Sequence, residues 1–362
     1  MSITKRSFGT LSTGEEATLF EMTNHNGMKV AVSDFGAVIA NIIVPDRDGN
    51  MADVALGFNS VTGYEENKPF FGSLIGRHAN RIGGAMFTLN GITYELEKNE
   101  IDPEEPENDT ENNLHSGFKS YNKYMYQAEC FEDEESSSIE LSRVSPDMEQ
   151  GFPGNLSMSV SYTLTDANEL IIEYSAVSDK DTIVNLTNHS YFNLAGHGAG
   201  SIEDHEVMIR SSKITTTDAE LIPTGEYTDV EGTPMDFRTL KRIGKDIDAD
   251  YEPLKQGKGY DHNYVLDKES VDVELCAKLV EPKSGRVMEV FTDLPGMQFY
   301  TGNNIKPCED SKDGVVYHKR DGVCFETQFY PNSCNIKEFP SPVLRAGEEY
   351  NYVTIYKFST ME

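Results

Sequence analysis

The sequence predicts an all-β protein, built as a sandwich or a barrel, and three observations support this. Segments in which apolar and polar residues alternate recur along the whole chain. Turn residues arrive roughly every eight to twelve residues, which is the spacing of short strands. No segment carries a long apolar stripe with the helical period, so helices should be few and short. No internal repeat or linker divides the chain, so residues 1–362 are predicted to form one domain.

Four segments carry the clearest strand pattern. Residues 28–44 alternate and then become continuously apolar, and Gly36 within them indicates a bulge or a close backbone approach. Residues 156–178 form two alternating runs around the turn residues TDANE, and residues 271–293 repeat the design around EPKSG. Residues 350–359 alternate once more near the C-terminus. The two central segments therefore predict antiparallel hairpins.

The composition limits the classes of ligand. The formal net charge is −30, so the average surface repels nucleic acid and acidic membranes. A small neutral or cationic ligand is the easier expectation. The chain has 18 Tyr and 18 Phe but no Trp, so any aromatic stacking on a ligand must use Tyr, Phe or His.

Neither the first residues nor the cysteines indicate export. Residues 1–20 contain no apolar core of signal-peptide length, and the apolar run at 37–44 is too short to span a bilayer. The five cysteines are scattered and form no CxxC pair, so neither a disulfide framework nor a zinc knuckle is expected. They are Cys130, Cys276, Cys308, Cys324 and Cys334. We expect a cytoplasmic protein.

Two stretches concentrate negative charge, at residues 95–112 and 129–140. Runs of like charge usually form solvated loops, and we expect that of both.

The common cofactor motifs are absent. There is no HExxH, no GxGxxG after a strand, no phosphate-binding GxxxxGK[ST] and no GxSxG. The eight histidines do not cluster with carboxylates at ligand spacing. We therefore expect neither a metal nor a nucleotide cofactor.

Six short islands combine polar groups with aromatic residues inside β sequence. They lie at residues 76–84, 112–123, 185–194, 259–267, 294–303 and 322–335. Sugar hydroxyls need paired donors and acceptors, while the apolar faces of a pyranose rest on aromatic rings. A few placed polar groups in an otherwise apolar site suit such a ligand.

One carboxylate in these islands is hard to explain as a surface group. Strand alternation puts Cys324, Glu326 and Gln328 on one face and Phe325 and Phe329 on the other. A carboxylate in so apolar a strand is costly to bury unless it is paired or functional. By contrast, structural roles would explain Arg81, His115 and His189 if each is taken singly.

Taken together, the islands resemble the galactose mutarotase (aldose 1-epimerase) family. The motifs NRIGGAMFTLNG, NLTNHSYFNLAG, PGMQFYTGN and FETQFYPNSCN match that family in content and order, over nearly the full chain. The resemblance implies a large antiparallel β-sandwich with an open monosaccharide site on one concave sheet. It also implies a monomer or homodimer that needs no metal or organic cofactor.

The resemblance assigns roles to seven residues. His189 would be the general acid and Glu326 the general base that open the hemiacetal ring. The residues that hold the substrate would be Asn80, Arg81, His115, Asp261 and Gln298. We expect acidic neighbours to keep His189 protonated, and the flanking asparagines and hydroxyls to orient its ring.

The chain departs from the family pattern near His115. Ser116 replaces the first glycine of a usual pair, and KYMY stands where a Trp often follows. The acidic stretch 100–111 resembles an insertion. If it overhangs the site it would alter substrate range, and deleting residues 101–110 tests this.

Three other functions remain open at this stage. The first is an isomerase of hexose 6-phosphates, although the charge of −30 argues against it. The second is a non-catalytic sugar-binding module, and the third is a glycosidase using Glu326 and Asp261 as its two carboxylates. The sequence leaves the preferred sugar and the oligomeric state undecided.

Overall fold

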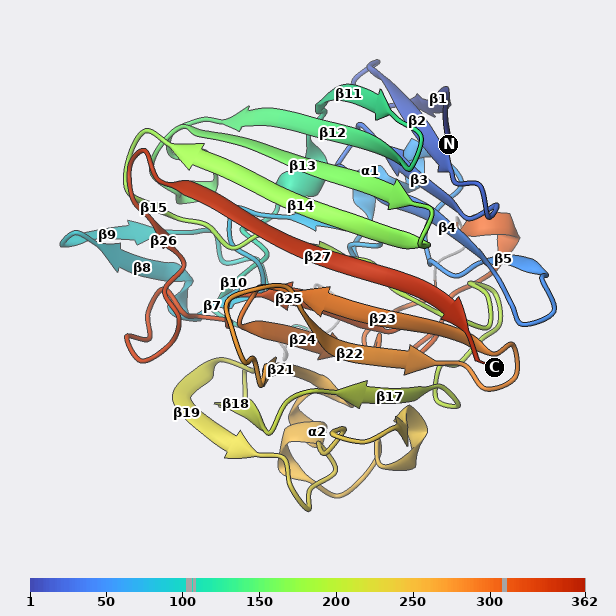
Figure 1. The fold of residues 1–362 in the computed structure, drawn as a ribbon. Coiled ribbons are helices and arrows are strands. Elements are labelled where there is room, and N and C mark those ends of the chain that lie inside the picture. The colour runs from blue at the N-terminus through green and yellow to red at the C-terminus, as the bar shows by residue number, and fades with distance from the viewer. Residues whose placement is uncertain (102–105, 107–108, 308–310, 362) are drawn as a thin grey trace.

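Strands dominate the computed structural model, which describes residues 1–101, 106, 109–307 and 311–361 (Figure 1). The largest sheet in these residues has nine strands. In spatial order they are β11 (Gln127–Glu132), β12 (Ser136–Ser145), β13 (Leu156–Thr165), β14 (Glu169–Ser178), β27 (Glu349–Thr360), β23 (Arg286–Thr292), β22 (Glu274–Val280), β17 (Glu206–Ile209) and β20 (Lys241–Arg242). The predicted all-β class is confirmed.

The hairpins predicted from alternation are confirmed. β13 pairs antiparallel with β14, from Leu156 opposite Ser178 to Leu164 opposite Leu170. β22 pairs in the same way with β23. Along β13 every second side chain is buried, because a strand presents alternate residues to opposite faces.

Two five-stranded sheets in the described residues complete the main framework. The first runs β1 (Ser2–Thr10), β2 (Glu16–Thr23), β3 (Lys29–Ser33), β4 (Ile39–Pro45) and β5 (Met51–Asp53). The second runs β19 (Pro223–Asp229), β18 (Lys213–Thr217), β21 (Asp261–Val265), β24 (Gly296–Tyr300) and β25 (Cys324–Gln328). Gly36, between β3 and β4, has a φ of +69°. A Cβ there would lie 2.6 Å from the backbone oxygen of Asn122, so the predicted close approach is confirmed.

Short strand pairs and helices fill the remainder. The two-stranded pairs are β6 (Ser73–Ile75) with β16 (Thr187–His189), β7 (Arg81–Ile82) with β10 (Asn113–Leu114), β8 (Met86–Leu89) with β9 (Ile92–Glu95), and β15 (Thr182–Ile183) with β26 (Val343–Leu344). The α-helices of the described residues are only α1 (Val61–Glu66) and α2 (Glu252–Gln256), as expected. None of the helices described has the length and apolar character needed to cross a membrane.

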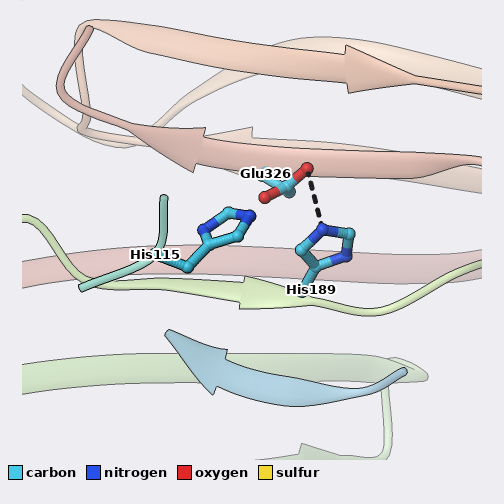
Figure 2. A group of neighbouring side chains, drawn as sticks. All are labelled: His115, His189 and Glu326. Atoms are coloured by element: carbon cyan, nitrogen blue, oxygen red, sulfur yellow. Dashed lines mark ion pairs between the residues drawn. The ribbon is translucent and has the colours of Figure 1, made fainter. Parts of the chain in front are cut away.

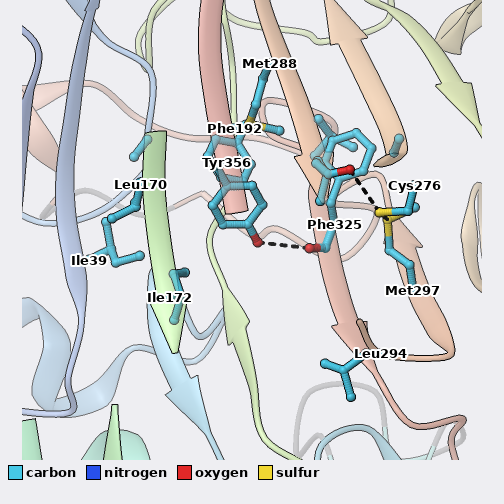
Figure 3. Close-up of a cluster of buried hydrophobic side chains, with 14 of the residues drawn as sticks. Ile39, Leu170, Ile172, Phe192, Cys276, Met288, Leu294, Met297, Phe325 and Tyr356 are labelled. Carbon is cyan, nitrogen blue, oxygen red and sulfur yellow. Dashed lines mark hydrogen bonds between the residues drawn. The ribbon is translucent and has the colours of Figure 1, made fainter. Parts of the chain in front are cut away.

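The main core lies between the nine-stranded sheet and both five-stranded sheets. One hydrophobic cluster contains Ile39 of β4, Ile172 of β14, Tyr356 of β27 and Phe325 of β25 (Figure 3). The Tyr356 hydroxyl donates to the backbone oxygen of Phe325 at 3.0 Å. Burying such side chains stabilises the fold by about 1.5–3 kcal/mol each. Because Phe325 faces this core, its neighbour Glu326 projects from the opposite face of β25.

The expectation of a solvated loop at 129–140 is wrong for most of the segment and holds only at residues 133–135, which are exposed and join two strands. Most of this segment belongs to the hairpin of β11 and β12, in which Glu129 pairs with Glu140 and Cys130 with Ile139. Ile139 is fully buried in the main core, while the glutamates stand outward. Glu129 and Glu140 therefore lie on the solvent face of an edge hairpin, while Asp133, Glu134 and Glu135 lie in the exposed loop that joins its two strands.

Candidate active site

The segment NLTNHSYFNL holds His189 through its backbone. β16 pairs with β6, so that His189 lies opposite Ser73. The Asn188 side chain donates to the backbone oxygen of Gly72 at 3.0 Å and accepts from the Ser190 hydroxyl at 2.6 Å. Asn185 accepts from the backbone N–H of Phe329 at 2.9 Å, which ties this segment to the end of β25. The asparagines therefore fix the strand that carries His189, and among the described residues they make no hydrogen bond to its imidazole ring.

The ring of His189 instead faces residues of β25. Its Nε2 lies 3.7 Å from Oε1 of Glu326, and its Nδ1 lies 3.5 Å from Sγ of Cys324. Figure 2 shows Glu326 approached by the rings of both His189 and His115. The His189 and Glu326 residues are only 5% and 2% exposed. No described residue is hydrogen-bonded to Oε2 of Glu326.

Burial sets the protonation of this pair. It lowers the pKa of His189 from 6.5 to about 4. Burial also raises the pKa of Glu326 well above its usual range, and the nearby charge of Asp261 adds to this while Arg81 opposes it. The expectation that acidic neighbours keep His189 protonated is therefore wrong, because loss of hydration dominates its pKa. In the ligand-free site the pair favours a neutral imidazole beside a carboxylic acid.

His115 reaches the same place from another segment. It follows β10, and its backbone N–H donates to the oxygen of Asn80 at 3.1 Å. Its ring Nδ1 accepts from the Asn80 backbone N–H at 3.1 Å, so the neutral ring carries its proton on Nε2. Burial lowers the pKa of His115 well below its usual value, and His189 and Arg81 add to the effect. His115 is thus a neutral hydrogen-bond donor whose ring centre lies 5.3 Å from that of His189.

Asn80 and His115 hold unusual backbone angles, with φ values of +62° and +50°. Non-glycine residues in this left-handed region are uncommon and cost free energy. The two reciprocal contacts between these residues hold both conformations in place.

Asp261 and Gln298 form the next group along the sheet. Gln298 lies opposite Glu326 across the β24–β25 pair. Its Nε2 donates to Oδ1 of Asp261 at 2.6 Å. Burial raises the pKa of Asp261, while Arg81 and the bond from Gln298 oppose the rise. The amide oxygen of Gln298 has no hydrogen-bond partner among the described residues, so it is available to accept from a ligand.

Arg81, at the start of β7, makes an ion pair that the sequence did not predict. Its Nε lies 2.8 Å from Oε1 of Glu100, and both side chains are only 13% exposed. Burial works to lower the pKa of Arg81, but Glu100 and Asp261 outweigh it and the pKa is raised. The guanidinium therefore stays charged.

Aromatic rings surround the two histidines. Phe70 lies 4.9 Å from the ring centre of His115 and 5.9 Å from that of His189. Tyr191 stacks on His189 at 5.0 Å, and Tyr300 meets it edge-on at 6.3 Å. These rings keep the acid–base pair in an apolar setting, which is the physical origin of its shifted pKa values.

All seven residues predicted from the sequence are linked by these contacts and charges. Sequence reasoning missed Cys324 as a neighbour of His189, although its place two residues before Glu326 on the same strand face was a usable signal. It also missed Phe70, for which the sequence carries no signal, and Glu100, which was hidden in an acidic run.

The expectation that histidines and carboxylates do not cluster is wrong in three dimensions. His115, His189 and Glu326 offer ligand atoms that all lie within 4.8 Å of one another. They come from three separate segments, so no sequence motif links them. With bonds of about 2.1 Å, two ligand atoms of one zinc ion lie at most about 4.2 Å apart. The three side chains would therefore have to move closer together to bind a zinc ion.

The acidic stretch 100–111 is only partly described. Residues 102–105 and 107–108, and with them most of the suggested overhang, lie outside the described residues. Glu100 itself is paired with Arg81 and its side chain is only 13% exposed, so the expectation of a solvated loop is wrong at this residue. Of the cysteines, Cys308 also lies outside the described residues, and the four described ones are free thiols.

Comparison with known proteins gives one consistent result. The model of the family described as "Aldose 1-epimerase" matches residues 18–357. The galactose mutarotase of Rattus norvegicus is 41% identical over 359 residues, covering 99% of both chains. That of Homo sapiens is 41% identical over 358 residues, with the same coverage. The crystal structure of a galactose 1-epimerase from Lactobacillus acidophilus superposes with a TM-score of 0.85 at 25% identity, covering 100% of this chain and 99% of the other.

Proposed function

The chain belongs to the aldose 1-epimerase family and is an aldose 1-epimerase, and from this premise we propose that it interconverts the α and β anomers of free hexoses such as D-glucose and D-galactose. In this proposal His189 is the general acid and Glu326 the general base. The observation that carries it is the approach of His189 Nε2 to within 3.7 Å of Glu326 Oε1, in a buried setting next to groups able to bind hydroxyls.

The reaction requires two coordinated proton transfers. Glu326 takes the proton of the C1 hydroxyl, and His189 gives a proton to the ring oxygen. The bond between C1 and the ring oxygen breaks, its electron pair stays on that oxygen, and C1 becomes an aldehyde carbon. Rotation about C1–C2 followed by the reverse transfers closes the ring from the other face. The two side chains together hold one proton throughout.

The ligand-free protonation state fits this sequence. The pKa directions favour a neutral His189 beside a protonated Glu326. Those are the states that the two groups reach once the sugar ring is open. When the cyclic sugar binds, its hydroxyls offer hydrogen bonds to the carboxylate, and the single proton passes to His189. Burial thus stabilises the pair in the form that accompanies the open-chain aldehyde.

The substrate-holding roles are proposed for five side chains. The neutral His115 donates from Nε2, Gln298 accepts through its oxygen, and Asp261 accepts from hydroxyls. Asn80 shapes the loop that presents His115, and Arg81 supplies the positive charge of the site. These residue types match what several neighbouring hydroxyls require.

We also propose that residues 1–362 form one domain, active in the cytoplasm as a monomer or homodimer. The matched family region covers residues 18–357, and one hydrophobic cluster includes residues from Phe20 to Phe358. The four described cysteines are free thiols, as is usual in a reducing compartment.

The direct test is polarimetry on freshly dissolved α-D-glucose and α-D-galactose, with glucose 6-phosphate alongside. We expect the protein to speed equilibration of both free sugars well above the spontaneous rate, and to act poorly on the phosphate ester. No acceleration for either free sugar, although the protein is folded and binds them, would contradict the proposal and leave a sugar-binding module. Hydrolysis of a chromogenic glycoside would support a glycosidase instead.

A further inference from the structure

The ion pair between Arg81 and Glu100 is one of the few little-exposed ion pairs among the described residues, and it adjoins the candidate site. The distance from Arg81 Nε to Glu100 Oε1 is 2.8 Å, and both side chains are 13% exposed. Exposed pairs contribute little free energy, whereas a pair withdrawn from water must satisfy its charges internally. Glu100 therefore belongs to the electrostatics of the candidate site.

Glu100 is held in position by the far end of its own segment. The Thr110 hydroxyl donates to Oε2 of Glu100 at 3.1 Å, and the Thr110 backbone N–H donates to the backbone oxygen of Glu100 at 3.0 Å. Next to them, the Asn99 backbone N–H donates to the oxygen of Asn112 at 3.3 Å. Both carboxylate oxygens of Glu100 are thus bound, one by Arg81 and the other by Thr110.

This arrangement is connected to the site through β10. The Asn99 side chain accepts from the backbone N–H of Leu114 at 2.7 Å and donates to the Leu114 oxygen at 2.8 Å. The next residue is His115. The same short stretch of backbone therefore positions Glu100 on one side and His115 on the other.

The charge of Glu100 acts on the substrate-holding group. Arg81 lowers the pKa of Asp261, whereas Glu100 raises it. The charge of Arg81 is thus shared by two carboxyl groups, through a direct ion pair with Glu100 and a longer-range interaction with Asp261. A guanidinium is the side chain best suited to carboxylates and phosphates, but here an internal carboxylate already occupies part of its donor edge.

We infer that Glu100 is a specificity-determining residue that restricts the site to uncharged aldoses by occupying Arg81. The inference rests on the proposed function, because Arg81 acts there as a substrate-holding residue. An aldose with a carboxylate or phosphate would have to compete with Glu100 for the guanidinium and would meet its negative charge. A neutral sugar meets neither obstacle.

The test compares neutral and anionic sugars of matched stereochemistry. The rate of α/β exchange is measured at equilibrium by NMR for D-glucose against D-glucuronate and for D-galactose against D-galacturonate. The quantity of interest is the ratio of kcat/KM for the neutral sugar to that for its uronate. We expect Glu100→Gln, which keeps the shape and removes the charge, to lower this ratio by about tenfold, mainly through the KM of the uronate.

Two further variants serve as a milder perturbation of Glu100 and as a matched control. Thr110→Val removes only the bond to Oε2 of Glu100, and we expect it to lower the ratio in the same direction by a smaller factor. Glu220→Gln is the matched control, because Glu220 accepts from the Asn112 side chain at 2.9 Å and loses the same charge near the same segment. We expect Glu220→Gln to leave the ratio unchanged.

The outcomes separate this inference from the proposed function. If the wild type accelerates exchange of neutral sugars and neither Glu100→Gln nor Thr110→Val lowers the ratio, Glu100 does not set specificity and only the inference fails. If Glu220→Gln lowers the kcat/KM ratio as much as Glu100→Gln does, the effect comes from the overall negative charge of this region and not from Glu100. That result would also overturn the inference. If the wild type accelerates no free aldose, the proposed function fails, and the inference fails with it.

Discussion

The two halves of the candidate site treat charge in opposite ways. In the acid–base half, His189 and Glu326 lie 3.7 Å apart, beyond normal hydrogen-bond distance, and burial drives the pKa of each toward its neutral form. In the holding half, Arg81, Asp261 and Gln298 make contacts of 2.6–2.8 Å, and Arg81 stays charged beside Glu100. The two halves use different strands, His189 and Glu326 lying on β16 and β25, and the holding residues on β7, β21 and β24. They adjoin because β21, β24 and β25 are neighbours in one sheet.

The difference follows from what each half must do. Proton exchange with a substrate depends on the pKa values of the acid and the base, and burial without strong pairing shifts the pKa of both His189 and Glu326 away from its ordinary value. A substrate is held best by groups that do not move, and paired charges with short hydrogen bonds provide this. The predictions below test whether the two halves respond to substitution as differently as their geometry indicates.

The largest effect is expected from His189→Asn. The substitution removes the proposed general acid, so kcat for galactose should fall by about 10²–10⁴-fold. KM should change by much less, because the holding half is untouched. Steady-state polarimetry measures both values, and circular dichroism checks the fold. If the folded variant keeps the wild-type kcat, His189 is not the general acid and another group must donate the proton. The nearest alternative is His115.

Asp261→Asn should instead act mainly on binding, raising KM by about tenfold with a smaller change in kcat. It should also shift the pH profile, because the charge of Asp261 helps to raise the pKa of Glu326. Without that charge the pair loses its one proton at lower pH, so the alkaline limb of kcat/KM should move to lower pH. A profile of kcat/KM against pH for both proteins checks this, and an unmoved limb would show that the two carboxyl groups are not coupled.

His78 is a buried histidine outside the acid–base pair, so it shows how burial alone changes the pKa of an imidazole. Its ring nitrogens have no hydrogen-bond partner among the described residues, and burial lowers its pKa from 6.5 to about 3. As pH falls below about 6.5, His78 becomes protonated in the unfolded chain but stays neutral in the folded chain, so the free energy of unfolding decreases. Between pH 6 and pH 4 the wild type should therefore lose up to about 1.4 kcal/mol of unfolding free energy per pH unit more than His78→Leu.

Urea unfolding at several pH values measures both slopes. Only the difference in slope matters here, because the substitution also changes packing. Equal slopes would mean that His78 is not held neutral by burial, and would weaken the same explanation for His189.

Local pattern predicted much of the fold. Alternation was enough for the β13–β14 hairpin and for the side of β25 from which Glu326 projects, because a strand has a fixed period of two. Alternation was overlooked at residues 129–140, where the charges hid the inward-facing Ile139. A count of charges does not show which side chains between them are buried.

The site needed information that no local pattern carries. The resemblance pointed to His115, His189 and Glu326, but their convergence depends on the packing of three distant segments. The protonation of His189 was mispredicted because the acidic composition is visible in the sequence and the burial of one ring is not. Glu100 was missed for the same reason, since only its contact with Arg81 distinguishes it from its acidic neighbours.

The central claim is that Glu326 exchanges protons with the sugar and does not merely hold it. Glu326→Gln keeps the size and the hydrogen-bonding ability of the side chain and removes only its capacity as a base. Anomer exchange of galactose by NMR, together with saturation-transfer detection of bound sugar, gives rate and binding in one sample. We predict exchange reduced to near the spontaneous rate with binding retained. Exchange at the wild-type rate would contradict the assignment of Glu326 as the base.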